Sequence, residues 1–267
     1  MVMKIGLIYN VFDGEELLEG SIRQLYNHVY KVIAVYQTKS NWGEVYEGGK
    51  NEVLTLQRMG LIDEAIEFEP NITNERLNGC NNELQKRKLG FEKAKEMGCS
   101  HYLFMDCDEY YNANEFLNAV KTIQHHNFKA TVSQIQAYEK FPTLAKRQLE
   151  GYYVPFIHEI ESTRAIGFQK YPYYCDPTRT TGHSFAHLFQ KEQIVMHHFT
   201  SVRADIERKY RNSSAKINFN LSEMLQAYAH LENKSTETHK LVANKFAIDV
   251  SKILQPIPSS SPTCQAG

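Results

Sequence analysis

The chain has 267 residues, a formal net charge of −1 and a hydrophobic fraction of 42%. Such a composition can bury a sizeable core and gives no overall attraction to nucleic acid. The five cysteines, at positions 80, 99, 107, 175 and 264, are odd in number and form no C-x-x-C pair. Neither a disulfide framework nor a zinc site is therefore expected. Because no apolar stretch has the length of a signal peptide or a membrane span, we expect a cytoplasmic protein without a transmembrane segment.

The first part of the chain alternates between strand and helix patterns. Apolar runs predict strands at residues 3–9, 31–36 and 64–68, and a further strand that ends at Asp106. Apolar residues at helical spacing predict a helix after the first strand, a short helix at 51–59 and a long helix at about 78–97. This order predicts a parallel sheet with right-handed crossovers.

The pattern changes after Asp108. We expect a helix at 114–124 and strands at 131–138, 152–160 and 193–199. The C-terminal third reads as helical, at 204–216, 221–231 and 240–254. Residues 256–267 have the composition of a disordered tail. Since no internal repeat or clear linker is present, we expect a single domain.

Two aspartates follow the clearest buried-strand pattern, in the sequence His-Tyr-Leu-Phe-Met-Asp-Cys-Asp at 101–108. Alternate side chains of an extended chain share a face, so Asp106 and Asp108 are expected to point together. Two such carboxylates repel each other unless a cation lies between them. Oxygen ligands favour Mg²⁺ or Mn²⁺, with phosphates at the open positions. For this motif alone, an ordinary acidic turn after a strand is an equal alternative.

One arginine, Arg87, falls in the middle of the apolar stripe of the long helix. A buried arginine needs an anionic partner, because an uncompensated charge costs several kcal/mol. An anion bound at the strand end would serve, and so would a core carboxylate such as Glu67. The flanking Lys86 and Lys88 are expected to be solvated, with Lys88 closer to the cleft.

Polar residues also follow the first two strands. Tyr9, Asn10 and Asp13 come at the end of the first strand, and Gln37 follows the second. Ligands of open parallel sheets bind at the carboxyl ends of the strands. These side chains are therefore expected to contact a nucleotide base or ribose, although Asp13 is equally well suited to cap a helix.

Taken together, these motifs resemble glycosyltransferases of the GT-A fold, in the family-2-like group. The resemblance covers the first two-thirds of the chain and rests on Ile-Tyr-Asn-x-x-Asp-Gly-Glu-Glu, Gln-Lys-Arg-Lys-x-Gly and Phe-Met-Asp-Cys-Asp-Glu. It implies an α/β fold with a Rossmann-like, mixed and mostly parallel sheet flanked by helices, here followed by a helical C-terminal segment. It also implies that Asp106 and Asp108 bind the divalent cation and the ribose or diphosphate of a nucleotide sugar.

The donor implied by this resemblance is a UDP- or GDP-sugar. Family members often carry an acidic residue where this chain has Gln37, so the base stays open. We expect one catalytic domain over residues 1–255. It comprises a nucleotide-binding half at 1–110, an acceptor-binding half at 111–203 and a helical extension at 204–255, with the tail at 256–267 outside it.

The resemblance further implies transfer to a hydroxyl of a glycan, lipid-linked or protein-linked acceptor, with inversion at the anomeric carbon. Inversion needs a carboxylate to take the acceptor's proton, and we rank Asp176 above Glu159 for this role. Such enzymes often take a third metal ligand from the region of His197 and His198. We favour His198, although a core histidine is as good an account. The basic residues that could close over the diphosphate are Arg203, Lys209 and Arg211.

Two other functions fit parts of the sequence. A sugar-phosphate nucleotidylyltransferase also has a Rossmann-like half with metal-binding carboxylates, but it usually opens with a glycine-rich phosphate loop. Here only Gly14 follows the first strand. A non-catalytic carbohydrate-binding module is the second alternative, and the intact pair of Asp106 and Asp108 argues against it.

Overall fold

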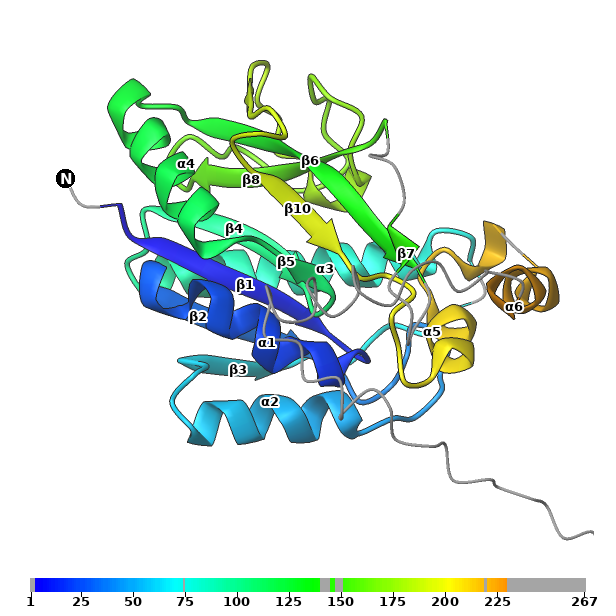
Figure 1. Ribbon diagram of the computed structural model, residues 1–267. Coiled ribbons are helices and arrows are strands. Elements are labelled where there is room, and N and C mark those ends of the chain that lie inside the picture. Colours follow the sequence, from blue (N-terminus) through cyan, green and yellow to red (C-terminus); the bar gives the residue numbers. More distant parts are fainter. Residues whose placement is uncertain (1–2, 74, 140–144, 147–150, 219, 230–267) are drawn as a thin grey trace, which may run out of the picture.

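In the computed structural model a mixed α/β sheet is flanked by helices (Figure 1). The residues that the structure describes are 3–73, 75–139, 145–146, 151–218 and 220–229. The helix expected at 240–254 and the tail expected at 256–267 lie outside them. Within the described residues, no helix is both long and apolar enough to cross a membrane.

The first part of the chain forms the parallel half of the sheet, in the order β3-β2-β1-β4. Its strands are β1 (Ile5–Val11), β2 (Lys31–Tyr36), β3 (Glu64–Glu67) and β4 (His101–Asp106). Its helices are α1 (Glu15–Leu25), α2 (Gly48–Arg58) and α3 (Asn78–Glu96), with a short 3₁₀ helix, η1 (Tyr26–His28), after α1. The elements predicted here from apolar periodicity are all confirmed.

The sheet continues past β4 as β8-β6-β10-β5. These strands are β5 (Glu109–Tyr110), β6 (Ala130–Glu139), β8 (Tyr153–Glu159) and β10 (Val195–His198). Two short strands, β7 (Ala145–Lys146) and β9 (His187–Leu188), pair with β6. The helices are α4 (Ala113–His126), η2 (Pro177–Arg179), α5 (Ile206–Asn212), η3 (Lys216–Asn218) and α6 (Leu221–Ala229). The fold class expected from the sequence is confirmed.

Strand direction decides what lies at each end of the sheet. β8 is antiparallel to both β4 and β6, while β6 and β10 are parallel to each other. β1, β6 and β10 therefore point to the same end, where α5 also lies, and β8 points the other way (Figure 1). We call this end the carboxyl edge of the sheet.

The two faces of the sheet bury separate cores because side chains alternate along each strand. Ile8 packs on one face with Leu84 and Phe91 of α3, whereas Tyr9 packs on the other face with Leu18 of α1. Helix α3 lies very close to the sheet at Gly90, where a Cβ atom would come within 2.2 Å of Ile8 Cγ2. Only glycine permits this approach, which brings the N-terminal half of α3 to the carboxyl edge.

Candidate functional site

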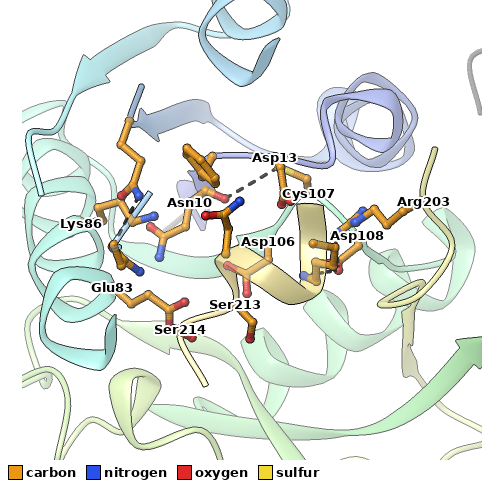
Figure 2. A pocket seen from close by; sticks show the side chains of 15 residues that line it. Asn10, Asp13, Glu83, Lys86, Asp106, Cys107, Asp108, Arg203, Ser213 and Ser214 are labelled. Atoms are coloured by element: carbon orange, nitrogen blue, oxygen red, sulfur yellow. Dashed lines mark hydrogen bonds and ion pairs between the residues drawn. The ribbon is translucent and has the colours of Figure 1, made fainter. Parts of the chain in front are cut away.

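A cavity lies at the carboxyl edge, where β1, β2 and β4 end beside α3 and α5 (Figure 2). It holds about 610 Å³ of empty space, including the part open to solvent. Its lining residues are Asn10, Phe12, Asp13, Gln37, Asn41, Glu83, Lys86, Asp106, Cys107, Asp108, Arg203, Lys209, Asn212, Ser213 and Ser214. Five of the residues predicted from strand ends are therefore brought together, namely Asn10, Asp13, Gln37, Asp106 and Asp108.

Several buried polar atoms on the cavity wall have no hydrogen-bond partner among the described residues. They are both amide atoms of Asn10, Oε1 of Gln37, and Nε and Nη1 of Arg203. A buried polar group without a partner costs about 1–3 kcal/mol. In a folded protein such groups bond to water, an ion or a ligand, and their concentration on one wall of a cavity favours a binding site.

Asp106 is held by two guanidinium groups. Arg179 Nη2 lies 2.6 Å from Asp106 Oδ2, and Arg87 Nη2 lies 3.3 Å from Asp106 Oδ1. Burial by itself would raise the pKa of Asp106, but the positive charges of Arg179 and Arg87 outweigh it and lower the pKa to about 2. Asp106 is thus the anionic partner of Arg87, in place of the bound anion or Glu67 expected from the sequence.

Glu109, the third acidic residue of this segment, holds both Asp106 and Arg179 in position. Its Oε2 accepts a hydrogen bond from the backbone N–H of Asp106 at 3.0 Å, and both its oxygens accept from Arg179, at 2.6 and 2.9 Å. Sequence reasoning missed both residues. Arg179 lies 73 positions beyond Asp106, and no local pattern links the two. The Glu after the Asp-x-Asp motif was the available signal for Glu109.

Asp108 has a different set of partners. Its Oδ2 lies 2.6 Å from Arg203 Nη2 and 3.4 Å from Lys209 Nζ. Burial would raise the pKa of Asp108, but Lys209 and Arg203 hold it well below its usual value. β4 ends at Asp106 and the chain turns at 107–108, so the alternation expected for one continuous strand does not extend to Asp108.

The two adjacent histidines take different positions. His198 Nε2 lies 3.5 Å from Asp108 Oδ2, whereas His197 Nδ1 and Tyr138 Oη form a hydrogen bond at 2.8 Å. Burial would lower the pKa of His198, but the charge of Asp108 raises it. The structure therefore places His198, not His197, beside the acidic motif.

The described residues contain no cluster of three or more His, Cys, Asp or Glu side chains that could hold a metal ion. The donors at hand are the carboxylate of Asp108 and the imidazole of His198, which lie next to each other. Mg²⁺ is commonly bound by one or two carboxylates together with substrate phosphates. This donor set therefore fits an ion that is shared with a phosphate-bearing substrate.

Two predicted site residues are misplaced, and both predictions are wrong. Tyr9 is fully buried and its hydroxyl bonds to Ser21 Oγ at 2.7 Å, because alternation along β1 turns it away from Asn10. Glu159 lies across from His101 in the β4–β8 strand pair, at the opposite edge of the sheet, because β8 runs antiparallel to β4. There its carboxylate forms an ion pair with Lys129 at 2.5 Å.

Asp176, the other candidate base, reaches the carboxyl edge. It caps η2, and its Oδ1 accepts hydrogen bonds from the backbone N–H and Oγ1 of Thr178, at 2.8 and 2.9 Å. Its Oδ2 lies 3.6 Å from both Arg87 and Arg179. The same two arginines therefore join Asp176 to Asp106.

The basic residues also separate into different groups. Arg203 and Lys209 line the cavity, whereas Arg211 forms a two-bond ion pair with Glu44, at 2.7 and 2.9 Å. The solvated position predicted for Lys88 is confirmed, whereas the predictions that Lys86 is solvated and that Lys88 lies closer to the cleft are wrong. Lys86 is buried and lines the cavity while Lys88 is exposed, because Lys86 shares the sheet-facing side of α3 with Gly90, one turn later.

The sequence matches no protein-family model and no curated protein. In structure the chain is similar to S. aureus TarS 1–349, with a TM-score of 0.44 and 10% identity over 92% of this chain and 71% of that chain. For the same protein in complex with UDP-GlcNAc the TM-score is 0.36 with 16% identity, over 51% of this chain and 35% of that chain. Mannose-1-phosphate geranyltransferase from Thermus thermophilus gives a TM-score of 0.33 and 15% identity over 59% of this chain and 50% of that chain. In its matches to the two ligand complexes of TarS, the chain spans about a third of the other chain's length.

Proposed function

We propose that this chain is a glycosyltransferase that moves a sugar from a nucleotide-sugar donor to an acceptor hydroxyl. The observation that carries the proposal is the composition of the cavity wall at the strand ends. It combines carboxamide atoms that lack partners, namely both polar atoms of Asn10 and Oε1 of Gln37, with the cationic side chains of Lys86, Arg203 and Lys209. A nucleoside diphosphate needs both kinds of group, since its base and ribose form neutral hydrogen bonds and its diphosphate is anionic.

The proposed roles follow the position of each residue. Asn10, Gln37 and Asn41 bind the base or ribose, and the ring of Phe12 gives the base an apolar surface. Arg203 and Lys209 bind the diphosphate. When the glycosidic bond breaks, negative charge develops on this leaving group, and fixed cations in a site shielded from water stabilise it.

We propose Mn²⁺ or Mg²⁺ dependence on the same ground. Asp108 and His198 would hold the ion, and the donor's phosphates would supply further ligands. The ion would add charge stabilisation of the leaving diphosphate. Asp106, whose side chain is 37% exposed, would accept hydrogen bonds from the ribose hydroxyls or reach the diphosphate through the ion, because two anions do not bind each other directly.

For an inverting reaction, Asp176 is the proposed general base. Its position at the carboxyl edge supports it over Glu159. Tyr152 and the exposed Tyr174, whose ring centroids are 5.2 Å apart, are the proposed stacking surface for the acceptor. The acceptor class remains as proposed from the resemblance, a glycan, lipid-linked or protein-linked acceptor. The four cysteines among the described residues are unpaired, which supports a reducing compartment such as the cytoplasm.

A donor screen tests the function. The protein is incubated with UDP- and GDP-sugars and Mn²⁺, and release of nucleoside diphosphate is followed. We expect release from one donor class, and its loss in the Asp106→Ala variant. Consumption of a nucleoside triphosphate and a sugar phosphate with release of pyrophosphate would instead establish a nucleotidylyltransferase. Binding of sugars without any turnover would establish a binding module.

A further inference from the structure

Lys86 is a buried lysine on the wall of the cavity. The residue is only 4% exposed. No hydrogen bond or ion pair joins it to another described residue, whereas the other two cations of the wall, Arg203 and Lys209, both pair with Asp108. Figure 2 shows Lys86 and Glu83 reaching from α3 on one side of the cavity and Arg203 on the other, with Asp106 between them. Lys86 is therefore the cation of the wall whose charge is not already used within the described chain.

The local structure explains how a lysine comes to be there. Gly90 lets α3 touch the sheet at Ile8 and Val35. Lys86 lies one turn nearer the N-terminus of α3 on the same side of the helix, and so just past the strand ends. Lys86 is buried there and lines the cavity, as a long side chain can when its stem is covered and its amine reaches a polar space. A methionine or leucine would fill the same space without burying a charge.

Keeping a charge in this position has a cost. Burial lowers the pKa of Lys86, and the nearby carboxylates of Glu83 and Asp106 only partly oppose this. Both acids remain too far from the amine for an ion pair, and Asp106 is already paired with Arg87 and Arg179. An anionic group of a ligand would supply the missing partner and form a charge-assisted hydrogen bond with the amine.

We propose that Lys86 is the phosphate anchor of the site, and that its amine binds an oxygen of the donor's diphosphate. The inference rests on the proposed nucleotide-sugar function and adds a residue to it. A lysine ammonium is a compact point charge, which suits a phosphate oxygen and adds little to recognition of a neutral base. Lys86 therefore contributes to affinity for the phosphates and not to selection among bases.

The test compares ligands that share a base and differ in charge. Binding of UDP, UMP and uridine (or the guanosine series, if the donor screen selects it) is measured by calorimetry for the wild type and for Lys86→Met, which keeps the stem. We expect affinity for the diphosphate to fall about tenfold or more and affinity for the nucleoside to change less than about twofold. Lys86→Arg should retain part of the diphosphate affinity. The matched control is Lys88→Met, an exposed neighbour whose loss should change nothing.

Equal losses for nucleoside and diphosphate would overturn the proposal, since Lys86 would then contact the base or shape the site. If the wild type binds the diphosphate and Lys86→Met binds it with the same affinity, the assignment of Lys86 is overturned while the proposed function stands. Lys86→Gln replaces Lys86→Met if the latter fails to fold.

Inorganic pyrophosphate separates this inference from the proposed function. If the wild type binds pyrophosphate through Lys86 but binds no nucleotide, the proposed function fails and the anchor is confirmed. If the wild type binds neither, both fail.

Discussion

At the residue scale, the two aspartates of the Asp-x-Asp motif are chemically alike but lie in different surroundings. Asp106 is about one-third exposed and faces Arg87 and Arg179, whereas Asp108 is 2% exposed and lies beside Arg203. Desolvation strengthens the electrostatic interactions of a buried charge. Asp108 also lies 3.5 Å from the imidazole of His198, and this pair of donors is the reason that it is the proposed metal ligand.

The metal proposal is tested by Asp108→Asn and His198→Gln. Each removes one donor, so Mn²⁺ binding in the presence of nucleoside diphosphate should weaken about tenfold or more, as measured by calorimetry or electron paramagnetic resonance. Glu159→Gln is the control, because Glu159 lies at the opposite edge of the sheet. Full turnover of the wild type in excess EDTA would contradict metal dependence.

The general base is tested by the pair Asp176→Asn and Glu159→Gln. Both changes keep the shape of the side chain and remove its basicity. We expect kcat to fall about 10²-fold or more for Asp176→Asn with nucleotide binding retained, and to stay near the wild-type value for Glu159→Gln. If Asp176→Asn is as active as the wild type, the base is another group or the reaction is not inverting.

At the scale of elements, Arg87 joins α3 to η2. The guanidinium is 1% exposed, donates to Thr178 Oγ1 at 3.1 Å, and lies 3.3 and 3.6 Å from Asp106 and Asp176. From the sequence, Arg87 was expected to pair with a bound anion or with a core carboxylate such as Glu67. Its contacts within the chain indicate a structural role as well.

Arg87→Met should therefore destabilise the protein. Removing one partner of a buried ion pair typically costs about 3–5 kcal/mol, and the continued pairing of Asp106 with Arg179 places the expected loss at the lower end of this range. Urea unfolding measures it, with the exposed Lys88→Met as control. Unchanged stability together with weaker nucleotide binding would show that Arg87 serves the ligand and not the fold.

Helix α5 and the residues after it form one wall of the cavity and contact the single tryptophan of the chain. The Trp42 indole N–H donates to the carbonyl of Ser213 at 2.9 Å, and the Lys216 amine lies 4.5 Å from the centre of its ring. Ser213 lines the cavity. Movement of this wall would therefore change the surroundings of the indole.

We expect nucleotide binding to change the fluorescence emission of Trp42. Arg211→Ala, which breaks the ion pair between α5 and Glu44, should alter the emission of the free protein and the size of this change. Arg23→Ala, which breaks an exposed pair with Glu19 within α1, is the control. Identical spectra with and without saturating nucleotide, as judged by calorimetry, would show that this wall does not respond.

At the scale of the whole molecule, the carboxyl edge collects charges from segments far apart in the chain, and its stability should depend on pH. The folded state lowers the pKa of Asp106 from 3.8 to about 2, so it favours the ionised form. The resulting stabilisation is present above about pH 3.8 and is lost as the pH falls toward about 2.

Asp106→Asn, which cannot ionise, should lose less stability than the wild type over this interval. Urea unfolding at a series of pH values measures the difference. Parallel pH profiles for the two proteins would show that Asp106 is not held in its ionised form by the fold.

Much of the fold was predictable because apolar periodicity is a local property of the chain. The strand over Lys31–Tyr36 has the predicted bounds, and α3 differs from the predicted helix by one residue at its end. The meeting of Asn10, Gln37 and Asp106 was also predictable, since the carboxyl ends of neighbouring parallel strands share one edge. These results needed only the order of the elements.

The sequence by itself thus determined the alternation of strands and helices and the edge at which the polar residues gather. Only the tertiary structure decided which charges pair. Arg179 reaches Asp106 across 73 positions and Arg203 reaches Asp108 across 95. Such contacts depend on how distant segments pack, which no local pattern encodes. The same reason accounts for Glu159: its distance along the chain is compatible with the site, but the reversed direction of β8 carries it to the opposite edge of the sheet.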